Sequence, residues 1–280
     1  MEITTLEKIE IDRIAEVLNE SFSDYIIPLQ LNSEQLAYKI FTENVRLDLS
    51  IGVFSSDKLI GFMLHGLNNV DGKLSAYNAA TGVIPNYRGQ GLVGQMYAYL
   101  LPKLKISGVA QMLLEVIEGN NSAIRSYEKM DYKVNRTLDC FSGAVKTVEK
   151  PPVALIKELD HFDWGKFNSF WTMKPSWQNS VITLENSKGR CSVAGAYIGG
   201  ELIGYIIYDP VLRRIRQIAV SSEHRRKGVA TQLVNTMIGL IDPKDLFINN
   251  VDHSSLETIA FLKSLGVSKN ISQLEMKREL

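Results

Sequence analysis

The stretch that decides the fold is Val83-Ile84-Pro85-Asn86-Tyr87-Arg88-Gly89-Gln90-Gly91-Leu92-Val93. It follows a run of strand-forming residues and leads into apolar residues at helical spacing, which predicts a strand ending at Val83, a glycine loop and a helix. Glycines at the start of a helix leave main-chain N–H groups uncovered, and the helix dipole adds partial positive charge there. We therefore expect this loop to hold a phosphate or diphosphate.

The chain contains a second copy of this stretch. Val220–Ala230 matches Val83–Val93 at an offset of 137 residues. Two further blocks recur in the same order, because Leu59–Leu64 resembles Leu202–Ile207 and Ala123–Met130 resembles Thr258–Leu265. Three blocks in one order at nearly one spacing indicate an internal duplication.

The boundary between the copies is predicted at residues 148 and 149, just before Pro151 and Pro152, where neither helix nor strand continues easily. The predicted domains are therefore 1–148 and 149–280. Apolar spacing in the first copy predicts helices at 11–22, 33–41, 92–104 and 122–130, and strands at 49–54, 59–65, 75–84, 112–116 and from 132 onward. The second copy repeats this order after a shorter start, so the fold class is α/β.

Composition and charge exclude several classes of function. Lysine plus arginine and aspartate plus glutamate both number 31, so the formal net charge is zero. Without a broad basic face we expect no binding to nucleic acid or to a membrane. The two cysteines lie in separate halves and form no zinc pattern, and no stretch is typical of a secretion signal or a membrane span. We therefore expect a cytoplasmic protein without a metal site.

Two interpretations of the glycine loop compete. Gly89 to Gly94 fits the dinucleotide pattern G-x-G-x-x-G, and Glu115 lies near the expected place of a ribose-binding acid. In the second copy, however, only the arginine and the glycine three residues later persist, as Arg225 and Gly228. A Rossmann loop also follows the first strand of its domain, whereas this loop follows the third. The shared pattern is therefore R-x-x-G.

Arg88-x-x-Gly91, the block from Asn120 through Ala123 to Tyr127 and the strand order resemble the GNAT superfamily of N-acetyltransferases. Arg225–Ala230 fits that family's Q/R-x-x-G-x-G/A loop throughout, whereas the first copy has Val93 where Gly or Ala is usual. The resemblance implies two GNAT-like domains, each a mixed, mainly antiparallel sheet flanked by helices, and acetyl-CoA as the cofactor. It implies cofactor contacts from Val83, Arg88, Gly89, Gln90, Gly91, Leu92, Val93, Gly94 and Asn120, and from Val220, Arg225, Arg226, Lys227, Gly228, Val229 and Ala230.

Transfer of an acetyl group to an amine needs a base for the amine, donors for the oxyanion and a proton for the leaving thiolate. The spacing of Glu115 and Tyr127 resembles that in the ribosomal-protein N-terminal acetyltransferases of the family, which implies that Glu115 is the base and Tyr127 the acid. The second copy has Asn250 and Leu262 at these positions, and neither transfers a proton at neutral pH. We therefore predict a catalytic first domain and a second domain degenerate in catalysis. From the residues alone, packing of Tyr127 and a backbone hydrogen bond to Glu115 remain alternatives.

Phe22 and Tyr25 lie between the two opening helices, where the resemblance places the acceptor, so we expect them to bind substrate. The predicted function is transfer of an acetyl group from acetyl-CoA to a primary amine by direct attack. The acceptor is a small-molecule amine or a peptide N-terminus. An acyl-CoA-binding sensor without turnover is the alternative, and a nicotinamide-dependent enzyme is a third hypothesis. Tandem copies can replace a dimer, which favours a monomer.

Overall fold

The computed structural model describes residues 1–27, 29–146, 151–239 and 245–280. By its contacts the chain forms two compact units. The first unit contains Met1–Asn135 together with Leu274–Leu280, and the second unit contains Arg136–Gln273. The domain boundary predicted at residues 148 and 149 falls outside the described residues and stays a prediction.

The first unit has a mixed sheet with helices packed on it. Its sheet order is β1-β2-β3-β4-β5, antiparallel except for the parallel pair β4 and β5, and the predicted elements are confirmed to within a few residues. One further strand is found at Glu2–Thr5, which is too short to show a period. The elements are β1 (Glu2–Thr5), α1 (Ile11–Ser21), α2 (Ser33–Thr42), β2 (Ile51–Ser55), β3 (Lys58–Val70), β4 (Lys73–Val83), α3 (Leu92–Ile106), β5 (Gln111–Ile117) and α4 (Asn121–Glu128).

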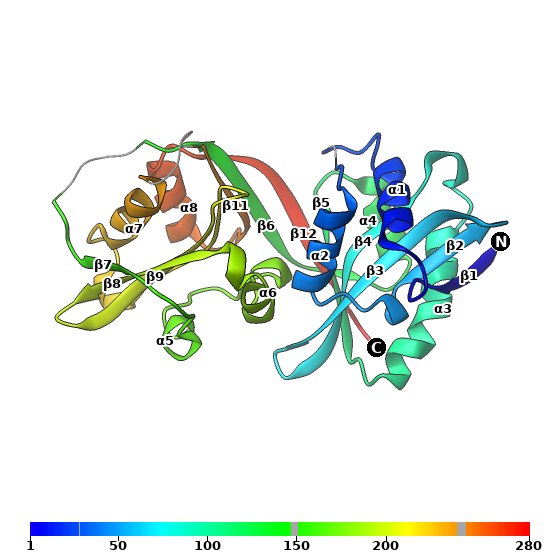
Figure 1. Cartoon of the computed structure of the whole chain (residues 1–280), viewed down its shortest axis with the longest axis horizontal. Coiled ribbons are helices and arrows are strands. Elements are labelled where there is room, and N and C mark those ends of the chain that lie inside the picture. Colours follow the sequence, from blue (N-terminus) through cyan, green and yellow to red (C-terminus); the bar gives the residue numbers. More distant parts are fainter. Residues whose placement is uncertain (28, 147–150, 240–244) are drawn as a thin grey trace. The chain divides into compact units, whose positions relative to one another are not determined.

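The second unit repeats this plan. Its strands run in the order β7-β8-β9-β10-β11, and β10 and β11 are again the parallel pair. Figure 1 shows α5–α8 grouped with these strands and α1–α4 grouped around β1–β5. The elements are β7 (Leu155–Glu158), α5 (Trp164–Asn168), α6 (Val181–Asn186), β8 (Ser192–Ile198), β9 (Glu201–Asp209), β10 (Arg214–Val220), α7 (Val229–Ile238), β11 (Asp245–Asp252) and α8 (Leu256–Ser264).

The last strands of the two sequence copies are exchanged. β6 (Lys133–Ala144), from the first copy, pairs antiparallel with β11 in the second unit. β12 (Ser268–Glu279), from the second copy, follows β5 in the strand order, and Leu274–Leu280 belongs to the first unit. There the Leu280 N–H donates to the Ala110 carbonyl at 3.0 Å, and Met276 is fully buried. The first unit therefore takes a core residue from the far end of the chain.

Each unit has its own apolar core, formed by apolar residues that recur on one face of a helix or strand. On α1, Ile14, Val17 and Leu18 recur on one face and are buried against the sheet. α2 begins with a capping box, in which Asn32 accepts from the Gln35 N–H at 2.8 Å and the Gln35 side chain accepts from the Asn32 N–H at 2.9 Å. Within the described ranges, no helix is both long and apolar enough to cross a membrane.

A histidine lies in the core of the first unit. His65 on β3 is fully buried, and neither ring nitrogen has a hydrogen-bond partner among the described residues. Burial lowers the pKa of His65 from 6.5 to about 3, because the core solvates the imidazolium poorly. Between these pH values the unfolded chain binds a proton that the folded unit does not. The stability of the first unit is therefore lost progressively as the pH falls below 6.5.

We expect His65→Leu to reduce this acid sensitivity. Between pH 7 and pH 5 the unfolding free energy of the wild type should fall by up to roughly 2 kcal/mol more than that of the variant. One pKa unit corresponds to about 1.4 kcal/mol. Urea unfolding followed by circular dichroism measures the difference. Tryptophan fluorescence reports the second unit alone, because all three tryptophans lie there. The exposed His161→Leu is the matched control, and identical pH dependence in both variants would contradict the argument.

Candidate functional site

Two parallel strands diverge at one end of the first sheet. β4 and β5 pair in register as far as Asn78 and Leu114, although β4 continues to Val83 and β5 to Ile117. The register between β3 and β4 also shifts beside Asn78, which marks a bulge. Bulges redirect side chains and end strand pairing, and they are frequent next to active sites. The predicted strand end at Val83 therefore lies where the pairing of β4 with β5 has already stopped.

The predicted glycine loop follows Val83 and leads into α3. After a 3-10 turn at Pro85–Tyr87, Gly89 and Gly91 adopt φ values of 75° and 72°, in the left-handed region that favours glycine. A Cβ at either glycine would meet no atom within 4 Å. The main-chain N–H groups of residues 89–94 have no main-chain acceptor in the described part of the chain, and α3 has no side-chain cap. An anion fits here, because the donors are free and the space beside both glycines is open.

The second copy reproduces this backbone with a different sequence. A 3-10 turn at Ser222–His224 again precedes the loop. Arg226 and Gly228 then adopt φ values of 63° and 91°, and α7 starts directly after Gly228. Arg226 stands where the first copy has Gly89, so the left-handed conformation is kept although the glycine is not.

The arginine shared by both copies bonds to the protein's own main chain. The Nε atom of Arg88 donates to the Val83 carbonyl at 3.0 Å, and the Nε atom of Arg225 donates to the Val220 carbonyl at 3.0 Å. A terminal nitrogen of each guanidinium also donates to a main-chain carbonyl earlier in the chain, that of Ser21 in the first unit and that of Phe170 in the second. Arginine suits this task because its planar group presents several N–H donors in a fixed geometry. Both arginines thus tie the loop to the end of its strand.

The phenol of Tyr127 lies at the diverging strands. Burial raises its pKa above the usual value, and the nearby Tyr97 adds to the rise, whereas a hydrogen bond with Thr81 on β4 opposes it. Thr81 is itself hydrogen-bonded to Asn78, and Asn78 donates to the Tyr97 hydroxyl at 3.2 Å. A chain of polar side chains therefore runs along β4 to Tyr127, and burial keeps the phenol protonated at neutral pH.

Asn120 links two of the other predicted residues to this phenol. Its Oδ1 accepts from the Ala123 N–H at 3.2 Å, which caps α4, the helix that carries Tyr127. Its Nδ2 donates to the Tyr25 hydroxyl at 3.2 Å, and the Tyr25 ring packs edge-on against Phe22 with centroids 5.0 Å apart. The structure therefore brings Phe22, Tyr25, Asn120 and Tyr127 together.

Glu115 lies on β5 and is half-buried. Successive side chains alternate across a strand, so Glu115 points to the face opposite Leu114 and Val116, which belong to the core of the first unit. The pairing of Glu115 with Tyr127 in catalysis stays a prediction.

The second unit contains a cavity of about 470 Å³, within the size range of small-molecule sites. It lies where β10 and β11 diverge, because their parallel pairing is limited to Arg214 with Phe247 and Ile215 with Ile248. Helix α8 and the segment 170–175 form further walls. Of the residues predicted to bind a cofactor in the second copy, all but Lys227 line this cavity: Val220, Arg225, Arg226, Gly228, Val229 and Ala230.

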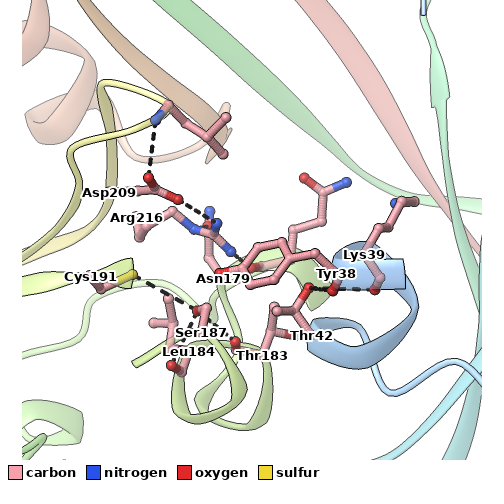
Figure 2. Close-up of polar contacts among 12 residues, drawn as sticks. Tyr38, Lys39, Thr42, Asn179, Thr183, Leu184, Ser187, Cys191, Asp209 and Arg216 are labelled. Atoms are coloured by element: carbon pink, nitrogen blue, oxygen red, sulfur yellow. Dashed lines mark hydrogen bonds and ion pairs between the residues drawn. The ribbon is translucent and has the colours of Figure 1, made fainter. Parts of the chain in front are cut away.

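One wall of this cavity is polar and internally hydrogen-bonded. The Gln217 side chain donates to the Asn179 carbonyl at 2.6 Å and accepts from the Tyr205 hydroxyl at 2.7 Å. Figure 2 shows Arg216 between Asn179 and Asp209, and its Nε donates to the Asn179 side chain at 3.2 Å. Asp209 and Arg216 are only 1% and 8% exposed and lie 4.0 Å apart, so each offsets the buried charge of the other.

The positions that correspond to Glu115 and Tyr127 carry no acid or base in the second unit. Asn250 lines the cavity and donates to the Ser176 hydroxyl at 3.1 Å. Leu262 is fully buried in the core of that unit. An amide and an alkyl group cannot exchange a proton at neutral pH, so neither residue can take the acid or base role predicted for Tyr127 and Glu115.

The sequence profile of the acetyltransferase (GNAT) family matches residues 11–132 and 156–267. The chain belongs to this family. The two matched segments correspond to the two copies of the duplication, so this is a tandem GNAT chain. The assignment favours the R-x-x-G interpretation of the loop over the dinucleotide interpretation. Family membership supports acyl transfer in general, with acyl-CoA as the donor that GNAT acetyltransferases use.

Curated relatives match part of this GNAT chain. An acetyltransferase of Pectobacterium atrosepticum is 30% identical over 102 residues, which are 36% of this chain and 67% of the relative. An acetyltransferase of Yersinia pestis strain Pestoides F is 34% identical over 80 residues, 29% of this chain and 54% of the relative. The match to the Yersinia protein thus spans only about half of that protein's length.

Solved structures resemble the GNAT chain over nearly its whole length. A GCN5-related N-acetyltransferase from Sphaerobacter thermophilus is 15% identical with a TM-score of 0.69, and the match covers 99% of this chain and 95% of that one. A tandem GNAT protein from the clavulanic acid biosynthesis pathway is 14% identical with a TM-score of 0.68, covering 99% and 98%. At these identities the likeness shows the fold alone.

No sequence pattern pointed to Thr81 or to the segment 170–175. Thr81 lies two residues before Val83, so strand alternation puts both side chains on one face of β4. This spacing was the only sequence signal that Thr81 lies near the glycine loop. Segment 170–175 shares no block with the first copy, and nothing in the sequence placed it beside the second loop.

Proposed function

We propose that this protein is an acetyl-CoA-dependent N-acetyltransferase whose chemistry takes place in the first unit. The observation that carries this proposal is the Tyr127 phenol, held protonated by burial at the diverging ends of β4 and β5, next to a loop of free main-chain N–H groups. The acceptor is a primary amine of a small molecule or of a peptide N-terminus.

Different residues of the first unit would bind the cofactor, stabilise the oxyanion, transfer protons and contact the acceptor. The N–H groups of residues 89–94 would hold the diphosphate of acetyl-CoA, which supplies the acyl group as a thioester when bound. Main-chain N–H groups near Val83 would stabilise the oxyanion. Glu115 would take the proton from the attacking amine, directly or through water, and the Tyr127 Oη would give its proton to the departing sulfur. Phe22 and Tyr25 would contact the acceptor.

The second unit would bind acyl-CoA through its own loop without transferring the acyl group. The support is the cavity of about 470 Å³, which the loop from Arg225 to Ala230 helps to line. The same cavity favours a second candidate function, an acyl-CoA sensor without turnover. In that case the cavity of the second unit would be the main ligand site of the protein.

A negative charge introduced into each glycine loop distinguishes the acetyltransferase from the sensor. We expect Gly91→Asp to weaken acetyl-CoA binding in the first unit at least about tenfold, because a carboxylate would face the diphosphate. Gly228→Asp should do the same in the second unit. Gly91→Asn and Gly228→Asn are the matched neutral controls, since Asn and Asp both tolerate a left-handed φ. Isothermal titration calorimetry counts the sites, and single-turnover acetyl transfer to an amine panel locates the chemistry.

The outcomes are distinct. Transfer lost in Gly91→Asp and retained in Gly228→Asp supports catalysis in the first unit. The reverse result would move the chemistry to the second unit. Binding at either site without transfer to any amine supports the sensor, and no binding of acetyl-CoA would refute both candidate functions.

A further inference from the structure

The loop arginine of the first unit holds a group that its counterpart in the second unit lacks. Both arms of the Arg88 guanidinium bond to the Asp24 carboxylate, at 2.7 Å from Nη1 and 2.8 Å from Nη2. Its Nη2 also donates to the Ser21 carbonyl at 2.9 Å. Within the described residues, Arg225 has main-chain carbonyl partners and no carboxylate. Among the described residues, the bond between the loop arginine and a carboxylate is therefore specific to the first unit.

Asp24 lies in the segment that the acceptor would meet. α1 ends at Ser21, and the chain then turns, with the Tyr25 N–H donating to the Phe22 carbonyl at 3.1 Å. Two side-chain links hold this turn, namely Asp24 to Arg88 and Tyr25 to Asn120. One link leads to the predicted cofactor loop, and the other leads to the cap of the helix that carries Tyr127.

The link between Tyr25 and Asn120 leaves one donor unused. Asn120 donates to the Tyr25 hydroxyl oxygen, so the hydroxyl hydrogen of Tyr25 can be given to a ligand. Tyr25 is close enough to Tyr127 to contribute to the raised pKa of that phenol. If the turn moved, this hydroxyl would move away from Tyr127.

An exposed ion pair gives a fold little stability, and Arg88 and Asp24 are 41% and 57% exposed. A two-armed pair does fix how the two side chains are oriented relative to each other, because both guanidinium arms meet both carboxylate oxygens. We propose that Asp24 is a positioning residue. Through Arg88 it holds the turn Phe22–Tyr25 against the cofactor loop, and it thereby sets the acceptor site beside Tyr127. The role in acceptor binding rests on the proposed function.

The test compares Asp24→Asn with a matched control elsewhere in the same unit. Arg46 and Asp48 also form a two-armed pair, at 2.9 Å from Nε and 2.6 Å from Nη2, and Asp48→Asn removes a charge of the same kind. We expect Asp24→Asn to raise the KM for the amine about fivefold or more, with the KM for acetyl-CoA changed less than about twofold. Asp24→Glu keeps the carboxylate and should restore part of the effect, and Asp48→Asn should change neither constant.

Amide hydrogen exchange provides a readout that does not require turnover. In Asp24→Asn, peptides covering Phe22–Tyr25 should exchange about tenfold faster, while exchange in Asp48→Asn stays at the wild-type rate. If the wild type acetylates no amine, the proposed function fails, and the exchange rates still decide whether Asp24 orders the turn. Unchanged exchange in Asp24→Asn would overturn the positioning role. Faster exchange with an unchanged amine KM would overturn the part that concerns the acceptor.

Discussion

Replacing Tyr127 by phenylalanine is expected to lower kcat for acetyl transfer by about a hundredfold or more, the usual contribution of a positioned acid. Burial raises the pKa of this phenol, so it carries its proton throughout the neutral range and can supply it to the departing thiolate. The ring of phenylalanine fills nearly the same space, which leaves the packing against Tyr132 largely intact. Release of free thiol, followed under steady-state conditions, measures the loss.

Tyr99→Phe is the matched control for this prediction. Tyr99 lies on α3 of the same unit and is exposed, and the loss of its hydroxyl should leave kcat unchanged. The double variant Glu115→Gln with Tyr127→Phe gives the stricter test. If it keeps turnover within about tenfold of the wild type, these two residues do not have the assigned acid and base roles, because acid–base catalysis contributes more than that.

Ending the chain after Gln273 is expected to unfold the first unit and leave the second unit folded. Leu274–Leu280 belongs to the first unit although it comes last in the sequence. Its loss removes Met276 from the core, the Leu280 bond to Ala110 and the bond from Arg278 to the Met130 carbonyl at 2.8 Å. Hydrogen exchange of β3 and β4 should show the loss of protection, while the tryptophan fluorescence of the second unit persists.

Point variants test how much single residues of β12 contribute to the stability of the first unit. Met276→Ala should destabilise the first unit by roughly 2–5 kcal/mol, as expected for a large buried side chain cut back to alanine. The neighbouring Lys277→Ala, which changes a partly exposed residue, should have little effect. Wild-type protection of β3 and β4 in the shortened chain would show that the first unit does not depend on β12.

Much of the candidate site could be predicted from short-range patterns. The glycine loop, the helix after it and the strand before it are all local features, and Gly89 and Gly91 adopt the left-handed conformation that their residue type favours. The duplication was also visible, because it preserves residue types in order. The family match confirms two GNAT segments, and the acid and base roles of Tyr127 and Glu115 stay proposals.

Contacts between distant residues were not predictable in the same way. The sequence shows that Arg88 is shared with the second copy, but not that its guanidinium bonds Asp24 and the Val83 carbonyl. Thr81 and Asn78 gave no pattern, although they connect Tyr97 to Tyr127. Such contacts depend on which strands and turns meet, and a periodic pattern carries no information about the partner.

The exchange of the last strands shows most clearly that strand partners cannot be predicted from local sequence patterns. The sequence predicts strands from Tyr132 onward in the first copy, and the duplication predicts their counterparts at the end of the second copy. Either strand could extend either sheet, since main-chain hydrogen bonds are the same for every partner. That β6 pairs with β11, and that Leu274–Leu280 joins the first unit, follows from how the whole chain packs. Local chemistry thus determined the repeated loop and its helix, whereas long-range packing chose the strand partners and the place of the cavity.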